Sequence, residues 1–490
     1  MTDVSINNSL AAGPVLVVDL DGTLTPSDSL VEGLLHVLRE RPAALPALLP
    51  ALLRGRAAFK RAVFDAAALP PEALPYRDDL LAFLRERREQ GQRIVLATAA
   101  DERIAQGVAG HLNLFDDVLA TRPGLNLKGE AKLAAIRERI GPDFVYAGDS
   151  RADLPVWRGA RGAILVGPGR KYRQALNGQV PVVHEFGPAS GPGLGAWVRA
   201  LRLHQWLKNV LVFVPLLTGD TGLGLTPVLA TVAAFLAFSL LASATYLVND
   251  LLDLPSDRQH PRKKFRPMAS GRIGIPQALG MAMVCLAAAF VLALQLPAKF
   301  GLVLLAYWVI TTAYTVKIKR YVLLDVLTLA VLYTTRIVAG AAVLAIAMSP
   351  WLLAFSAALF LSLALVKRCS ELVLMHQQGR SQTSGRDYNV TDLPVLQALG
   401  TAAAISAIVV FGLFISQPMT LQRYAQPDLL WVAALGLTYW LGRLWIKTAR
   451  GEMHDDPLVY TLMDRGCRVT LLVIIVVSVA ARFHIPGLQA

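Results

Sequence analysis

Three aspartates and an asparagine stand where a long apolar run ends, in residues 249–257. Asp250, Asp253 and Asp257 recur at intervals of three and four, so a helix would carry all three carboxylates on one face. The carboxylates would repel one another there unless a cation lay between them, and oxygen ligands suit Mg²⁺. The pattern predicts that Asn249, Asp250, Asp253 and Asp257 hold Mg²⁺, with Asp250 and Asp253 as catalytic residues. An ordinary charged loop beside a membrane span is the alternative interpretation.

A basic segment, residues 258–267, follows these acids directly. Neither acids nor bases are tolerated in lipid without a functional reason, so a helix that presents both as it leaves the bilayer indicates a binding site. A metal held by carboxylates and flanked by cations suits a diphosphate. We therefore expect phosphate chemistry at a membrane surface.

A second group of acids follows short buried strands near the N-terminus. Asp19 and Asp21 follow the expected strand Pro14–Val18, Thr98 ends another strand, and Asp149 and Asp153 follow a later one. The carboxyl ends of parallel strands meet at one edge of a sheet, so we expect these side chains to lie together.

These motifs, in the order DxDGT, a hydroxyl residue, a lysine and GDxxxD, resemble the haloacid dehalogenase-like phosphatase superfamily over roughly residues 13–185. The resemblance implies that Asp19 is a nucleophile that forms an aspartyl-phosphate. It also implies that Asp21 protonates the leaving alkoxide and then activates water, and that Thr98 binds the phosphoryl oxygens.

The same resemblance implies a Mg²⁺ site and a lysine, because a carboxylate attacks a phosphate dianion only if cations cancel the repulsion. The implied metal ligands are Asp19, Asp21, Asp149 and Asp153. Lys132, at the head of a helix, fits the lysine motif better than Lys128, which remains the alternative.

The elements that position these residues indicate two different domains. Strands expected at 14–18, 93–98, 144–148 and 163–166 alternate with helices, which predicts a Rossmann-like α/β domain over residues 1–186. A Leu-rich helical insertion at about 30–65 is expected to form a small cap. Residues 1–12 lack the pattern of a signal peptide, so this domain is expected in the cytoplasm. A glycine- and proline-rich linker at 187–195 leads into an all-α membrane domain, residues 196–490.

Apolar segments of this second domain predict about nine transmembrane helices, the first and last of them marginal in length. They fall near 209–218, 226–248, 275–295, 299–316, 322–346, 350–366, 395–416, 428–446 and 469–484. Alternate connections hold nearly all the lysines and arginines, whereas the opposite loops offer only Lys299 and Arg423. Positive residues favour the cytoplasmic side, so the acidic motif and the phosphatase domain are expected to face the cytoplasm.

Composition excludes other classes of protein. The chain has 490 residues, 54% of them hydrophobic, and a net charge of +13. The excess of positive charge is better explained by contact with an anionic membrane surface than by binding to nucleic acid, so no nucleic-acid partner is predicted. Cys285, Cys369 and Cys467 are scattered and odd in number, which implies neither a disulfide framework nor a thiolate metal site.

The NDxxDxxxD motif and the helical pattern of residues 196–490 resemble the UbiA superfamily of intramembrane prenyltransferases. Within it, residues 257–271 (DRQHPRKKFRPMASG), 205–209 and 367–372 look closest to the decaprenyl-phosphate phosphoribosyltransferases. The second aspartate-rich motif of aromatic prenyltransferases is reduced here to residues 317–320 and Asp325, which departs from the two-motif metal arrangement of those relatives.

This resemblance implies that phosphoribosyl pyrophosphate is the donor and a polyprenyl phosphate the acceptor, with Mg²⁺ as cofactor. The phosphatase domain would then remove the 5-phosphate of the lipid product to give a precursor of cell-envelope glycans. The candidate substrate-binding residues are Lys208, Asn249, Arg258, Lys263, Lys264, Arg266, Lys317, Arg336 and Lys367.

One other function stays open at this point. A prenyltransferase that moves a polyprenyl chain from its diphosphate to an aromatic ring, with a phosphatase of unrelated substrate attached, would share many of these features. In either case we expect a multi-pass protein of the bacterial cytoplasmic membrane that could form homo-oligomers.

Overall fold

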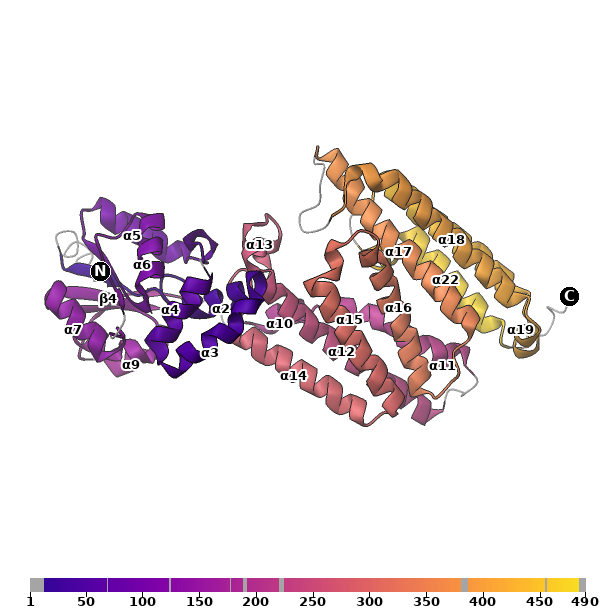
Figure 1. Ribbon diagram of the computed structural model, residues 1–490, viewed down its shortest axis with the longest axis horizontal. Coiled ribbons are helices and arrows are strands. Elements are labelled where there is room, and N and C mark those ends of the chain that lie inside the picture. The colour runs from indigo at the N-terminus through magenta and orange to yellow at the C-terminus, as the bar shows by residue number, and fades with distance from the viewer. Residues whose placement is uncertain are drawn as a thin grey trace, which may run out of the picture. The chain divides into compact units, whose positions relative to one another are not determined.

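The computed structural model describes residues 13–67, 69–122, 125–176, 178–187, 192–219, 224–379, 387–453 and 456–483 (Figure 1). The chain divides into two compact units. The first comprises Met1–Leu203 and Tyr246–Met283, and the second His204–Thr245 and Val284–Ala490. The acidic motif therefore belongs to the same compact unit as the phosphatase-like domain. Residues 188–191 of the predicted linker lie outside the described residues.

The first unit contains a six-stranded parallel sheet, which confirms the predicted α/β class. Its order is β3-β2-β1-β4-β5-β6. The strands are β1 (Val15–Val18), β2 (Ile94–Asp101), β3 (Asp117–Thr121), β4 (Phe144–Gly148), β5 (Gly162–Val166) and β6 (Val182–Phe186). The expected strands correspond to β1, β2, β4 and β5, whereas β3 and β6, the two edge strands, were not expected.

Side chains of β1 alternate between two apolar cores, because successive residues of a strand point to opposite faces. Leu16 and Val18 join one core, which α5 (Asp78–Glu89) and α6 (Glu102–Leu112) cover. Val17 joins the other, which α7 (Glu130–Arg139) and α8 (Leu154–Arg158) cover. With both faces covered, the sheet is rigid, and its carboxyl edge is left to carry chemistry.

The predicted cap is present as three helices, α2 (Ser29–Glu40), α3 (Leu45–Leu53) and α4 (Arg56–Ala67). Asp28 caps α2 by accepting hydrogen bonds from the backbone of Leu30 and Val31. Val37, Leu48 and Val63 form a small apolar cluster that joins the three helices.

The rest of the first unit surrounds the acidic motif. It consists of α10 (Leu194–Ala200), the end of α12 (Leu225–Leu252), α13 (Leu254–Gln259) and the start of α14 (Ile275–Leu294). Their apolar side chains, including Leu251, Leu254 and Met268, form a buried cluster, and Val31 and Leu35 of α2 pack against it.

The second unit is helical. Its later helices are α15 (Ala298–Val316), α16 (Leu324–Val343), α17 (Pro350–Gln377), α18 (Leu393–Ile415), α20 (Leu429–Ala449), α21 (Pro457–Met463) and α22 (Arg465–Ala480). Helix α17 packs against α16, α18 and α20. Bulky side chains such as Trp440 and Trp445 fill the space between these helices.

Seven helices in the described residues are long and apolar enough to cross a membrane: α12, α14, α15, α16, α17, α18 with its preceding turn, and α20. The two segments predicted to be marginal are shorter. Residues 209–218 form the end of a 3-10 helix, η5 (Leu203–Phe213), and the short α11 (Val214–Thr218), and residues 469–484 fall mostly in α22, which has 16 residues.

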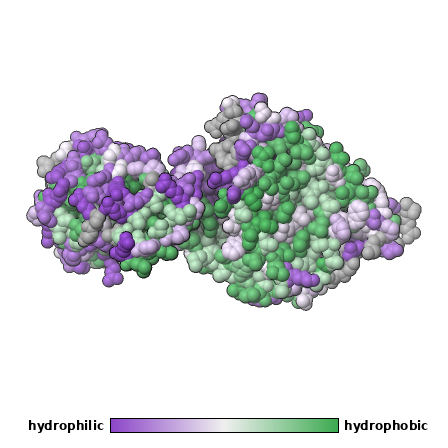
Figure 2. All heavy atoms as spheres, viewed as in Figure 1, coloured by the Kyte–Doolittle hydropathy of each residue, from purple (hydrophilic) through white to green (hydrophobic). Residues whose placement is uncertain are grey.

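The surfaces of the long helices are apolar. Figure 2 shows hydrophobic side chains gathered over these helices and hydrophilic ones over the sheet domain. Leu302, Val309, Ile405, Val409 and Leu435 are each more than half exposed. Water-soluble proteins seldom expose so much contiguous apolar surface, so the chain is an integral membrane protein.

Candidate active sites

The candidate nucleophile of the phosphatase domain lies against a buried lysine. Asp19 follows β1 directly, and its Oδ2 is 2.8 Å from Lys132 Nζ. Lys132 also lies 3.6 Å from Asp153 and donates a hydrogen bond to the Tyr146 hydroxyl (2.8 Å). Of the two candidate lysines, Lys132 therefore holds the buried position beside Asp19.

Asp153 is fixed from several sides. Its Oδ1 accepts a hydrogen bond from Tyr146 (2.7 Å), and its Oδ2 accepts bonds from the backbone and hydroxyl of Ser150 (3.0 and 2.9 Å). Oxygens of Asp19, Asp149 and Asp153 lie within 4.8 Å of one another. Three carboxylate oxygens at such distances fit a hard divalent cation such as Mg²⁺. The group does not include Asp21, which was expected among the metal ligands.

Asp21 instead faces the cap. Its carboxylate accepts hydrogen bonds from the backbone (2.8 Å) and hydroxyl (3.1 Å) of Ser29, at the start of α2. Burial, together with the negative charge of Asp28, raises the pKa of Asp21 to about 7. A carboxyl group with such a pKa can carry a proton at neutral pH and release it, as a general acid and base must.

The other charges in the site follow from burial and pairing. Burial raises the pKa of Asp19, and burial with the charges of Asp19 and Asp153 raises the pKa of Asp149 to about 7. Burial opposes the charge of Lys132, but Asp19 and Asp153 outweigh it and raise the pKa of this lysine. The lysine is therefore a permanent cation beside the nucleophile, and the excess negative charge suits a bound metal.

One glycine is required for this geometry. Gly22 has φ +78°, and a Cβ built on it would lie 2.2 Å from Asp149 Oδ2. The backbone after Asp21 therefore passes so close to Asp149 that only glycine fits, which explains the glycine of the DxDGT motif.

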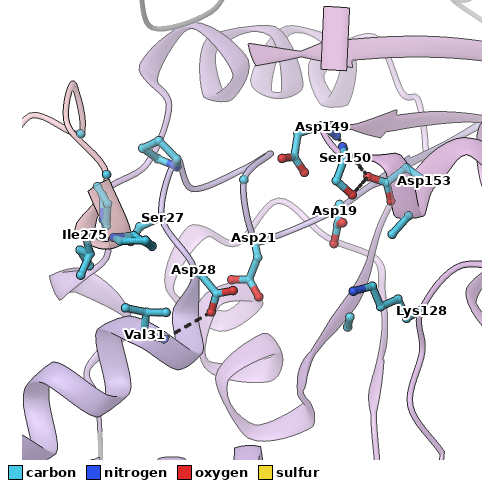
Figure 3. Close-up of a pocket in the computed structure, with 18 of the residues that line it drawn as sticks. Asp19, Asp21, Ser27, Asp28, Val31, Lys128, Asp149, Ser150, Asp153 and Ile275 are labelled. Atoms are coloured by element: carbon cyan, nitrogen blue, oxygen red, sulfur yellow. Dashed lines mark hydrogen bonds between the residues drawn. The ribbon is translucent and has the colours of Figure 1, made fainter. Parts of the chain in front are cut away.

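A cavity of about 410 Å³ opens in front of these carboxylates. In Figure 3, Asp19, Asp149 and Asp153 lie at one end, Asp21 and Asp28 lie in the middle, and Ile275 and Val31 lie at the other end. Lys60 of α4 and Lys128 also line the cavity. Thr98 does not: it is fully buried, its hydroxyl accepts a bond from the backbone of Ala100, and the next residue, Ala99, reaches the wall.

The carboxylates of the NDxxDxxxD motif are balanced differently. Asp250 accepts bonds from Arg202 (2.5 Å) and Arg266 (3.2 Å), and Arg266 also bonds Asp257 (2.5 Å). Asn249 donates to Asp253 (3.1 Å). The three acids do not form a compact ligand group among the described residues. Arginine side chains thus offset the charge of Asp250 and Asp257, and Asp253 has the Asn249 amide as its partner.

The basic residues of this segment fall into three groups. Arg266 lies among the carboxylates, and Lys263 is 4.0 Å from Asp257. Lys264 is exposed. Arg258 turns the other way, to Glu32 of α2 (2.6 and 3.0 Å) and the carbonyl of Ala73 (3.0 Å). Its guanidinium is thus already paired away from the acidic motif, so we do not propose it as a substrate ligand.

In the second unit, two candidate lysines meet at one acid. Asp456 Oδ2 lies 2.6 Å from Lys208 and 3.7 Å from Lys367. Burial opposes the charge of Asp456, but the two lysines outweigh it and lower its pKa. Two ammonium groups on one carboxylate leave a local positive charge that suits a phosphate.

Other charged residues of the second unit are paired inside the helix bundle. Asp325 is bonded by Arg368 (2.5 Å) and by the Tyr388 hydroxyl, all three being buried. Arg336 donates to Asn209 (2.8 Å) and Tyr307 (3.0 Å). Lys317 is exposed where α15 ends. The partners of Asp325 and Arg336 account for ions that would otherwise be costly in a membrane.

Two family models match the chain. Residues 211–464 match the UbiA prenyltransferase family, and residues 16–158 match haloacid dehalogenase-like hydrolases. The chain belongs to the UbiA prenyltransferase family. Its N-terminal domain is a haloacid dehalogenase-like domain, as the motif order predicted.

Relatives show both the fusion and a named activity. "Uncharacterized protein y4nM" of Sinorhizobium fredii is 41% identical over 92% of this chain and 87% of its own length, so the alignment includes both domains. "Decaprenyl-phosphate phosphoribosyltransferase" of Mycolicibacterium smegmatis is 29% identical over 59% of this chain and 93% of its own length. A solved UbiA homolog from Archaeoglobus fulgidus, bound to GPP and Mg²⁺, is 17% identical, with a TM-score of 0.44 over 58% of this chain and 99% of that one.

Three residues of these sites were not among the sequence predictions. Arg202 bonds Asp250 from 48 positions away, and nothing in the local sequence marks it. Lys60 lines the phosphatase cavity, and a lysine in a largely apolar cap could have indicated this position. Asp456 lies among charged residues before the last helix, but its pairing with two distant lysines follows only from the fold.

Proposed function

We propose that the UbiA half transfers a 5-phosphoribosyl group from phosphoribosyl pyrophosphate to a polyprenyl phosphate, and that the phosphatase domain removes the 5-phosphate of the lipid product. The observation that carries the proposal is the relative named decaprenyl-phosphate phosphoribosyltransferase, which matches the UbiA half over 93% of its own length. The haloacid dehalogenase-like domain of the same chain, with Asp19, Asp149 and Asp153 gathered beside Lys132, supports the second step.

In the transfer, a lipid phosphate oxygen attacks C1 of the ribose, the bond from C1 to the diphosphate breaks, and diphosphate leaves. Asn249, Asp250, Asp253 and Asp257 are the residues that would hold Mg²⁺, which would supply positive charge beside the departing diphosphate. Arg202 and Arg266 now pair with Asp250, and we infer that they turn to the diphosphate when the carboxylates take the metal. Lys208 and Lys367 are proposed to bind a substrate phosphate.

In the second step, Asp19 attacks the phosphorus and the bond to the ribose 5-oxygen breaks. Asp21 gives its proton to that oxygen and then takes a proton from the water that hydrolyses the aspartyl-phosphate. Lys132 stabilises charge on Asp19 and the phosphoryl group. Asp19, Asp149 and Asp153 are the residues that fit Mg²⁺ here.

The test is an incubation of membranes containing the full chain with ³²P-labelled phosphoribosyl pyrophosphate, polyprenyl phosphate and MgCl₂. With label on the 5-phosphate, lipid should first gain ³²P and then lose it as inorganic phosphate. With ¹⁴C on the ribose, the label should stay in the lipid. Absence of both labels from lipid would contradict the transfer, and transfer of an allylic chain to an aromatic acceptor in a parallel assay would favour the aromatic prenyltransferase.

We also propose that the connections carrying most lysines and arginines face the cytoplasm of a bacterial cell. Cysteines introduced at Ser270 and Gln295, both exposed, lie in connections at the two ends of α14. Because the native cysteines are buried, an impermeant maleimide reports mainly on the new ones. In intact spheroplasts Gln295→Cys should react and Ser270→Cys should not, and the opposite result would reverse the orientation.

A further inference from the structure

The cavity of the phosphatase domain is built partly by residues that follow the acidic motif of the UbiA half. Residues 268–276, which we name the wall loop, contribute Met268, Gly271, Ile273, Gly274, Ile275 and Pro276 to its lining. All of them belong to the same compact unit as Asp19. The cavity that presents a phosphate to Asp19 is therefore not completed by the phosphatase domain alone.

The wall loop is held in place by specific contacts. Arg258 lies in α13, whose Leu254 shares a buried apolar cluster with Met268 and Ile275 of the wall loop. Arg258 joins α13 to Glu32 of the cap with two hydrogen bonds, and both side chains are largely buried. Gly271 has φ +71°, and a Cβ on it would lie 3.1 Å from Pro26, in the segment just after the DxDGT motif. A buried ion pair and a close backbone approach fix the position of a loop far better than exposed polar contacts do.

The two ends of the cavity differ in chemistry. The end at Asp19 carries three carboxylates and Lys132, whereas the wall loop and Val31 at the other end present apolar side chains and backbone (Figure 3). Ile275 and Pro276 are also the first residues of α14, a membrane-spanning helix. A substrate with its phosphate on Asp19 would therefore pass the wall loop where that helix enters the bilayer.

We propose that the wall loop makes the phosphatase select phosphomonoesters carried on a membrane lipid over free sugar phosphates. A lipid-borne substrate gains apolar contact with the loop beyond its phosphate and sugar, while a free sugar phosphate fills only the acidic end. This rests on the proposed function, because the lipid-linked ribose 5-phosphate is the substrate that it supplies. Glu32 and Arg258 act as positioning residues, since their ion pair joins the cap to α13, which packs against the wall loop.

The test measures kcat/KM of the full chain in lipid nanodiscs for two phosphomonoesters, polyprenyl-phosphoryl-ribose 5-phosphate and free ribose 5-phosphate. Glu32→Arg and Arg258→Glu each place like charges together, and the double variant restores an ion pair of opposite sense. Each single variant should lower the ratio of lipid to free substrate about tenfold, mainly through KM for the lipid, and the double variant should recover most of it.

Two further variants complete the design. Glu40→Arg is the matched control: it makes the same change of charge at the exposed end of α2, where the partner of Glu40 is the adjacent Arg39. This variant should keep the native ratio of kcat/KM for the lipid and free substrates. Ile275→Ser removes apolar contact without touching the ion pair and should lower the ratio as well. If Glu32→Arg does not fold, Ile275→Ser decides the outcome.

An unchanged ratio in the single variants and Ile275→Ser would overturn the role of the wall loop, and so would a parallel fall of both activities. A native chain that hydrolyses ribose 5-phosphate but leaves the lipid substrate intact would instead overturn the proposed role of the phosphatase. The two failures are therefore distinguishable.

Discussion

Two clusters of aspartates in this chain solve the same electrostatic problem in different ways. In the phosphatase domain, Asp19, Asp149 and Asp153 stand at the ends of buried parallel strands, with their oxygens gathered and one buried lysine between two of them. In the NDxxDxxxD motif, Asp250 stands at the end of α12 and Asp257 in the short helix α13, and Arg266 bridges them.

The difference follows from the elements that carry the acids. Adjacent strand ends of a covered sheet lie about 4.8 Å apart, so their side chains converge without any ligand. The acids of the other motif come from the end of α12, from residue 253 between two helices and from α13, so no common edge gathers their oxygens. Arginine side chains balance the charge of Asp250 and Asp257 instead. The phosphatase cluster is preformed, and the acids of the NDxxDxxxD motif are held by arginine side chains, which we propose bind the diphosphate.

Replacement of the phosphatase nucleophile should give the largest effect. Asp19→Asn keeps the size of the side chain but removes the attacking oxygen, so dephosphorylation should fall at least about a thousandfold. Transfer should continue, and the lipid-linked ribose 5-phosphate should accumulate, as mass spectrometry of extracted lipid would show. If the variant yields the same dephosphorylated lipid as the native chain, the phosphatase serves another substrate.

The matching change in the other cluster is Asp250→Asn. Loss of one anionic ligand should lower label transfer to lipid between about a hundred- and a thousandfold. Hydrolysis of p-nitrophenyl phosphate by the same preparation should persist, because the phosphatase carboxylates are a separate group. Full transfer by this variant would remove the acidic motif from the mechanism.

The two lysines near the phosphatase cluster offer a finer comparison. Lys132→Met removes the cation that lies 2.8 Å from Asp19, so p-nitrophenyl phosphate hydrolysis should fall about a hundredfold. Lys128→Met, on the cavity wall, should cost less than about tenfold, because an exposed charge is screened by water. Equal losses in the two variants would contradict the assignment of Lys132.

A pair of glycines isolates how closely the preformed cluster is packed. Gly22 and Gly91 have φ of +78° and +80°, but a Cβ on Gly91 meets nothing within 4 Å. Alanine at either position should lower the free energy of unfolding by about 1 kcal/mol, because its backbone is strained at these φ values. Only Gly22→Ala also displaces Asp149, so its phosphatase activity should fall between about ten- and a hundredfold. Thermal unfolding provides the measure of strain, and equal activity in the two variants would show that Asp149 tolerates displacement.

The sequence predicted those features that depend on short local patterns, such as an apolar strand followed directly by an acid. Asp19, Asp149 and Asp153 follow apolar strand patterns, so their meeting at one sheet edge could be expected from the strands alone. The edge strands β3 and β6 were missed because each mixes charged residues with apolar ones, as in Asp117 and Glu185, and lies partly exposed.

Contacts between distant residues could not be predicted in this way. Arg202 and Asp250 are 48 positions apart, and Arg258 and Glu32 are 226 apart. In the sequence both arginines are simply basic residues near a membrane surface, and only the packing of α2, α10 and α13 shows which acid each one meets. The choice between Lys128 and Lys132 likewise depended on the fold, because only the packing of α7 against the sheet shows that Lys132 is buried.

The buried contact between Asp325 and Arg368 has a consequence for biogenesis. Asp325 lies in the first turn of α16, and its cationic partner Arg368 lies in α17, where it also pairs with Glu371. Asp325 would therefore carry an unpaired charge if α16 left the translocon alone. As an antiparallel hairpin the two helices enter the lipid with these charges already neutralised, and the connecting residues 344–349 are short enough to permit this. We therefore expect α16 to stay in the translocon during synthesis until α17 has emerged, and the two helices to enter the bilayer together.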